Sequence, residues 1–172
     1  MKNIIIFCDF AELSVFLSSK KVLMIKRSIE SEIQREIGKG KAIIILGARQ
    51  VGKTTLLKNM FKEQKQILFL NGDESDVRAM FENPTSTALK AITGNREIVI
   101  LDEAQRITDI GLKLKLIIDN VPDVQVIATG SSSFELANRI NEPLTGRKWE
   151  HRMFPLSFSE LVGHDGLLEE KR

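Results

Sequence analysis

Eight residues in the first third of the chain constrain its fold more than any other feature. They read Gly-Ala-Arg-Gln-Val-Gly-Lys-Thr over 47–54 and fit the spacing G-x-x-x-x-G-K-[ST] at every fixed position. The apolar run 42–46 before them is typical of a buried strand, and the residues from Thr55 onward are typical of an amphipathic helix. Such a turn points backbone N–H groups inward, and the helix N-terminus adds partial positive charge. The segment therefore predicts a phosphate-binding loop.

Each fixed position of this loop has an expected task. Gly47 and Gly52 allow backbone conformations and close approaches that a side chain would block. Lys53 is expected to reach the β- and γ-phosphates of a nucleotide, and the Thr54 hydroxyl to ligate Mg²⁺. A chance glycine-rich turn would not explain a lysine and a threonine opening a helix. The expected nucleotide-binding residues are Gly47, Ala48, Arg49, Gln50, Val51, Gly52, Lys53, Thr54 and Thr55.

A second group of chemical residues follows the apolar strand predicted at 98–101, where Asp102 and Glu103 stand side by side. Ligands of open parallel sheets bind beyond the carboxyl ends of the strands, the edge at which the phosphate loop also begins. We therefore expect Asp102 to face the Mg²⁺ held by Thr54. Glu103 would accept a proton from an attacking water or orient it. The alternative is that both acids merely open a helix, where negative charge is favoured.

The strand predicted at 124–129 runs into a glycine and three serines. Hydroxyl groups at that edge could contact the γ-phosphate or the attacking water, and Ser131 is our candidate for this contact. The alternative is that these serines cap the next helix, since serine is a preferred N-cap residue.

An arginine at the edge of the domain is the third candidate for catalysis. Arg147 stands just before the strand predicted at 150–154, where it could reach the nucleotide of a neighbouring copy. An arginine that stabilises a transferring phosphoryl group contributes about 10³–10⁵ in rate. Arg49 and Arg139 are rivals for this part, and an exposed surface arginine is the plain alternative.

Strands and helices alternate along the chain. We expect helices at 26–37, from 53 to about 64, at 74–92 with a break near Asn83-Pro84, through 107–118, at 134–140 and after Ser157, which has Glu160 three residues on as in a capping box. Strands are expected at 42–46, 67–70, 98–101, 124–129 and 150–154. They are apolar runs, as when both faces of a sheet are covered. This pattern predicts a three-layer α/β/α sandwich around a parallel sheet.

Length and composition limit the number of domains, the kinds of partner and the cellular compartment that we expect. A chain of 172 residues is long enough for one domain with a real core. Its formal net charge of +2 offers no electrostatic reason to expect nucleic acid or a membrane surface as partner. Cys8, the only cysteine, suits a reducing cytoplasm. Acids interrupt the apolar N-terminus, so we expect residues 1–23 to be a loosely packed extension and 24–172 the folded unit.

Several motifs in the right order resemble the AAA-type ATPases of the AAA+ superfamily. They are GARQVGKTTLL, IVILDEAQRI, VIATGSSSFEL and LTGRKWEHRMFPLSFSEL, and the resemblance covers roughly 24–165. It is strongest to uncharacterised prokaryotic proteins that carry a C-terminal domain of unknown function. The resemblance implies a P-loop NTPase core with five strands in the order 5-1-4-3-2, and hydrolysis of ATP with Mg²⁺. It makes Lys53 and Thr54 the Walker A pair, Asp102 and Glu103 the Walker B pair, Ser131 the sensor and Arg147 the arginine finger.

Members of that group continue into a helical lid and a C-terminal domain, which we do not find before Arg172. We therefore expect weak ATP binding and slow hydrolysis by this chain. If Arg147 acts on the nucleotide of a neighbouring copy, the protein forms a homo-oligomer. We expect the missing C-terminal domain to supply the contact with a partner. Two other functions stay open. One is a nucleotide-dependent switch with little hydrolysis, and the other is a small-molecule P-loop kinase, although no acceptor-binding arginine set is evident. The biological process stays open as well, and so does the question whether nucleic acid is a partner.

Overall fold

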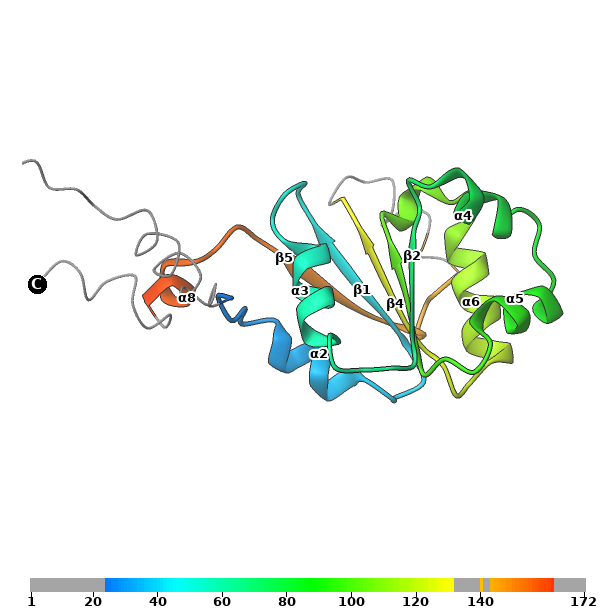
Figure 1. Cartoon of the computed structure of the whole chain (residues 1–172), viewed down its shortest axis with the longest axis horizontal. Helices are drawn as coiled ribbons and strands as arrows, with labels where there is room; N and C mark the ends of the chain where they lie inside the picture. The colour runs from blue at the N-terminus through cyan, green and yellow to red at the C-terminus, as the bar shows by residue number, and fades with distance from the viewer. Residues whose placement is uncertain (1–23, 132–139, 141–142, 163–172) are drawn as a thin grey trace, which may run out of the picture.

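The computed structural model describes residues 24–131, 140 and 143–162. The helices are α2 (Glu30–Glu36), α3 (Lys53–Met60), α4 (Ser75–Met80), α5 (Ser86–Thr93), the short 3₁₀ helix η1 (Ala104–Arg106), α6 (Ile110–Asn120) and α8 (Phe158–Val162). The strands are β1 (Ala42–Gly47), β2 (Ile67–Asn71), β3 (Ile98–Asp102), β4 (Gln125–Gly130) and β5 (Lys148–Met153). Figure 1 shows the strands as one twisted sheet between two groups of helices.

The five strands form a single parallel sheet in the order β2-β3-β4-β1-β5. Read from the other side, this is the order 5-1-4-3-2, so the predicted fold class and strand order are confirmed. β1 lies between β4 and β5, and every residue of β1, β3 and β4 is buried. Parallel sheets are covered on both faces, which explains why these strands are apolar runs without polar alternation.

Successive residues of each central strand enter two separate hydrophobic cores. Ile44, Val99 and Val126 belong to the core under α4, α5 and α6, while Ile43 and Ile100 belong to the core under α2 and α3. Because neighbouring side chains in a strand point to opposite faces, one apolar run serves both cores. Figure 1 shows the two helix groups on either side of the sheet. The predicted three-layer arrangement is therefore confirmed.

Several element boundaries differ from those expected. The first helix begins at Glu30 rather than near residue 26, and the N–H groups of Arg27 and Ser28 ahead of it donate to the side chains of Glu30 and Glu160. The helix after the phosphate loop ends at Met60, and the helical region 74–92 is two helices, α4 and α5, on either side of the predicted break. The last strand begins two residues earlier than expected, at Lys148.

The predicted cap of the last helix is present. The N–H of Glu160 donates to Ser157 Oγ at 3.2 Å, and the N–H of Ser157 donates to Glu160 Oε2 at 2.9 Å. This reciprocal pair is a capping box. The expected extension 1–23 and, apart from Ile140, the expected helix at 134–140 lie outside the described residues. None of the helices in the described part of the chain combines the length and the apolar character that a membrane-spanning helix needs.

Candidate functional site

The glycine-rich loop joins the carboxyl end of β1 to the first residue of α3, as expected. Ala48, Arg49 and Gln50 are exposed, whereas Lys53 is buried at the first position of the helix. The Lys53 ammonium lies across the loop and donates to the carbonyl oxygens of Gly47 and Ala48, each at 2.9 Å. An ammonium has three protons, so one remains for an oxygen of a bound anion.

The two glycines of the motif are needed for different reasons. Gly52 has φ 96°, a left-handed conformation that side chains disfavour, and it directly precedes the helix. Gly47 is needed for space, because a Cβ there would lie 2.5 Å from the carbonyl oxygen of Met153 on β5. Gln50 also has positive φ, at 65°. The loop therefore needs one glycine for its turn and another for its close contact with the neighbouring strand.

This close contact predicts a cost for Gly47→Ala. The added methyl group must push β1 and β5 apart at the end that carries the loop, so we expect unfolding to become easier by about 1–3 kcal/mol. ATP affinity should fall as well, since the loop changes position. Gly40→Ala is the control for ATP affinity, because a Cβ added there would meet no atom within 4 Å, and any loss of stability in it comes from the positive φ of Gly40 alone. Denaturant unfolding and ATP titration of both variants check the prediction, and equal ATP affinities in the two would contradict it.

Three side chains from three elements meet at the carboxyl edge of the sheet. Thr54 Oγ1 on α3 donates to Asp102 Oδ2 at 2.7 Å, and Thr129 Oγ1 on β4 donates to Asp102 Oδ1 at 2.5 Å. Asp102 is 5% exposed and Thr129 is completely buried. The carboxylate of β3 is therefore held by one hydroxyl on each oxygen. The structure brings the predicted Thr54 and Asp102 together.

Glu103 follows Asp102 in a strained conformation, with φ 48° and ψ 42°. A residue other than glycine in this region costs about 1–3 kcal/mol, and such strain concentrates at functional sites. Its N–H donates to Thr129 Oγ1 at 3.2 Å, and Gln105 Nε2 donates to its carboxylate at 2.6 Å. These contacts determine where the Glu103 carboxylate lies, half-buried beside Asp102.

A cavity of about 600 Å³ lies on the outer side of the phosphate loop. It is lined by loop residues Ala48 to Gly52 and by Thr55, by Met24 and Ile25 ahead of α2, and by Pro155 and Leu156 after β5. This volume is within the usual range for small-molecule sites, about 300–1,000 Å³. Three segments far apart in the sequence thus line an open pocket beside the loop.

The other two candidate residues lie at different places on the domain. Ser131 is half-buried directly after β4, at the same edge as Asp102. Arg147 directly precedes β5 at the opposite edge, where its Nε donates to Asp119 Oδ1 at 3.0 Å. Because β1 and β5 run parallel, Arg147 is far from the loop of its own chain. If Arg147 takes part in catalysis, it would therefore act on the nucleotide of a second copy. The roles of Ser131 and Arg147 stay predictions.

Sequence reasoning missed three contributors to this site. The sequence places Thr129 only within a predicted strand, although a hydroxyl at the end of an otherwise apolar strand is a usable signal. Gln105 stands two residues after Glu103 and was not considered. The cavity had no signal in the sequence, because its walls come from segments that only folding brings together.

Comparison with known proteins places this geometry in a family. The model of a family described as "AAA domain" matches residues 39–162. Two uncharacterised proteins, one from Mycobacterium bovis and one from Mycobacterium tuberculosis, are each 27% identical over 127 residues. Each match covers 73% of this chain and 28% of the relative. The chain therefore spans under a third of the length of these relatives.

Solved structures share the fold at low sequence identity. A Walker-type ATPase of Pyrococcus abyssi has a TM-score of 0.59 and 20% identity over 83% of this chain and 57% of its own. A chain in the structure of Drosophila ORC bound to AT-rich DNA and Cdc6 has a TM-score of 0.55 and 14% identity, covering 79% of this chain and 57% of its own. The Pif1 helicase of Candida albicans has a TM-score of 0.54 and 12% identity, covering 78% of this chain and 41% of its own. The fold of this chain is thus shared with a Walker-type ATPase and with other structures of low sequence identity.

Proposed function

Because the chain belongs to the AAA domain family, we propose that it binds ATP with Mg²⁺ at the carboxyl edge of the sheet and hydrolyses the β–γ bond. The observation that carries this proposal is the 2.7 Å contact between Thr54 Oγ1 and Asp102 Oδ2. It joins the residue after the loop lysine to the acid at the end of β3. The family match and the fold by themselves identify an AAA-type P-loop domain.

The residues present suit a magnesium ion. Mg²⁺ prefers oxygen ligands and is usually held by one or two side chains together with substrate phosphates and water. Thr54 supplies a hydroxyl and Asp102 a carboxylate, and both face the same point beside the phosphate loop. Bound there, the ion would neutralise charge on the β- and γ-phosphates. Thr129 keeps the carboxylate oriented through its own hydrogen bond.

The remaining residues of the chain provide anchoring and proton transfer. The Lys53 ammonium is held next to the loop and is available to a phosphate oxygen. Glu103 is placed beside Asp102, where its carboxylate can take the proton of a water that attacks the γ-phosphate. Gln105 holds one oxygen of that carboxylate and leaves the other for the water. Ser131, at the same edge, would contact the γ-phosphate or the water.

The cavity beside the loop is our proposed site for the adenine base. Met24, Ile25, Pro155 and Leu156 supply apolar walls on which a flat ring can rest. The loop residues Ala48 to Gly52 form the side of the cavity that faces the phosphates. The proposal thus keeps the loop residues and Thr55 as the nucleotide-binding residues. The ATPase would then work between copies if Arg147 of one reaches the nucleotide of the next.

Asp102→Asn tests the proposal through its dependence on Mg²⁺. The wild-type chain should release phosphate from ATP only when Mg²⁺ is present. Loss of one carboxylate charge should raise the Mg²⁺ concentration that gives half-maximal hydrolysis by at least about tenfold. Asp123→Asn is the matched control, an exposed aspartate at the other end of β4. The proposal fails if wild-type protein neither binds ATP nor hydrolyses it, or if transfer to a small acceptor replaces transfer to water.

A further inference from the structure

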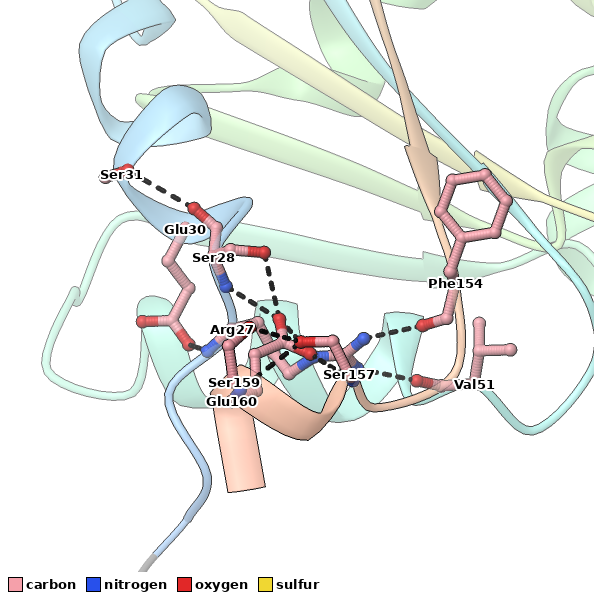
Figure 2. A network of polar contacts seen from close by, with 9 residues as sticks. All are labelled: Arg27, Ser28, Glu30, Ser31, Val51, Phe154, Ser157, Ser159 and Glu160. Atoms are coloured by element: carbon pink, nitrogen blue, oxygen red, sulfur yellow. Dashed lines mark hydrogen bonds and ion pairs between the residues drawn. The ribbon is translucent and has the colours of Figure 1, made fainter. Parts of the chain in front are cut away.

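Arg27 is a buried arginine ahead of α2, and its guanidinium connects three segments of the fold. It is 9% exposed. Its Nη1 donates to the Val51 carbonyl oxygen in the phosphate loop at 2.9 Å, and its Nη2 donates to the Phe154 carbonyl oxygen after β5 at 2.6 Å. Its Nε donates to Glu160 Oε1 on α8 at 3.2 Å. Figure 2 shows the guanidinium between these partners.

Glu160 in turn is held from two sides. Its Oε1 accepts from the N–H and the hydroxyl of Ser28, each at 2.9 Å, as well as from Arg27. Its Oε2 accepts from the N–H of Ser157 within the capping box. Burial by itself raises the pKa of this carboxyl, but the hydrogen bonds from Ser157, Ser28 and Arg27 outweigh burial and lower the pKa to about 2. Glu160 is therefore a carboxylate at neutral pH, held by Ser28 and Ser157 as well as by Arg27 (Figure 2).

The contact with Val51 has a consequence for the phosphate loop. The described peptide bonds are all trans, and in a planar trans peptide the carbonyl and the next N–H point in opposite directions. Arg27 holds the Val51 carbonyl on the outside of the loop, and its Nη1 lies 3.7 Å from the place of a Cβ on Gly52. The N–H of Gly52 must then point away from Arg27. That direction is toward the interior of the loop, where Lys53 Nζ donates to the Gly47 carbonyl oxygen.

We propose that Arg27 is a positioning residue for nucleotide binding, which holds the Val51–Gly52 peptide so that the Gly52 N–H faces the phosphates, and that Glu160 holds Arg27 for this task. This inference rests on the proposed function and adds a residue outside the motif to the same site. Gly52 has φ 96°, and glycine moves easily between left- and right-handed conformations. A loop with this freedom needs an outside contact to keep one peptide orientation. Arg27 supplies that contact as a charge-assisted hydrogen bond.

Lysine could not replace arginine here. The guanidinium is a planar fork whose three nitrogens serve the phosphate loop, the end of β5 and α8 at once. A lysine ammonium keeps the charge but concentrates its donors at one atom, so it cannot reach carbonyls on two sides and a carboxylate on a third. Arg27→Lys therefore removes the geometry while keeping the charge, and it is the informative substitution.

The test uses the whole 172-residue chain and two probes, ATP and inorganic triphosphate. We expect Arg27→Lys to raise the Kd of both probes by about ten- to a hundredfold, the effect of losing one hydrogen bond to a charged group. Glu160→Gln should raise both values by a smaller factor, because an amide oxygen still accepts some of the bonds. The amide NMR signal of Gly52 should shift in both variants before any probe is added. Arg35→Lys and Glu63→Gln are matched controls on exposed residues and should bind as wild type.

The outcomes separate this inference from the proposed function. If wild type binds neither probe, the proposed function is wrong and this inference falls with it. If wild type binds both probes but Arg27→Lys and Glu160→Gln bind equally well, only the inference is wrong. A loss for ATP alone, with triphosphate binding unchanged, would show that Arg27 serves the base and would also overturn it. Melting temperatures without ligand show which variants are folded. If Arg27→Lys is not folded, the binding of both probes to Glu160→Gln alone tests the inference.

Discussion

Replacing Glu103 with glutamine should lower the rate of ATP hydrolysis by about 10²- to 10⁴-fold, the usual contribution of a positioned general base. Glutamine keeps the size of the side chain but cannot take a proton from water. Because Glu103 lies beside Asp102 and not in the phosphate loop, ATP affinity should change little. Single-turnover phosphate release and ATP titration, carried out on the same preparation, measure the two effects.

The matched control for this prediction is Glu97→Gln. Glu97 is exposed and precedes the same strand at its opposite end. The Glu97→Gln variant should hydrolyse ATP at the wild-type rate. A nucleotide-dependent switch would behave differently, since a protein that rarely hydrolyses ATP has little activity for Glu103→Gln to remove. An unchanged rate in Glu103→Gln would therefore favour the switch and contradict a general base at this position.

Replacing Lys53 with methionine should raise the Kd for ATP by about ten- to a hundredfold or more, because a charge-assisted hydrogen bond to the phosphates is lost. The ammonium is already held beside the loop by two carbonyl oxygens, so little reordering opposes its contact with an anion. Methionine keeps most of the buried stem, which limits the effect on folding. Calorimetric titration with Mg²⁺ and ATP gives the affinity directly.

Two further measurements make the Lys53 result interpretable. Lys62→Met changes an exposed lysine just beyond α3, with 64% of its side chain exposed, and should leave ATP affinity as it is. The melting temperature of Lys53→Met without nucleotide reports the cost of leaving the Gly47 and Ala48 carbonyls without their donor. ATP binding of wild-type strength in a folded Lys53→Met protein would show that the phosphates lie elsewhere.

Much of the fold could be predicted because the signals are local. The central strands are runs of isoleucine, leucine and valine, which mark strands buried on both faces. The phosphate loop depends on residues adjacent in the sequence, so its place between β1 and α3 could be predicted as well. Thr54 and Asp102 could be paired in advance because Asp102 ends one strand and Thr54 follows the loop at the end of another, at the same edge of a parallel sheet.

Other parts of the site could not be predicted, and the reason differs from residue to residue. Thr129 is hidden in an apolar strand, and only the pairing of β4 beside β3 brings its hydroxyl to Asp102. Arg27 falls within the helix predicted at 26–37, but its backbone N–H and that of Ser28 have side-chain partners. Glu160 was recognised as half of a capping box, yet its second oxygen binds residues more than 130 positions away. Such contacts have no signature in the spacing of residues.

The sequence by itself determined which elements form and which of their ends carry chemistry, because hydrophobic periodicity, glycine conformation and helix capping act over a few neighbouring residues. Only the tertiary structure decided how these ends are completed. It put Arg147 at the amino end of the sheet, lined an open cavity with three distant segments, and placed the Arg27 guanidinium between the phosphate loop, β5 and α8. The physical reason is that buried polar groups must find partners wherever the packed chain offers them, whatever their separation along it.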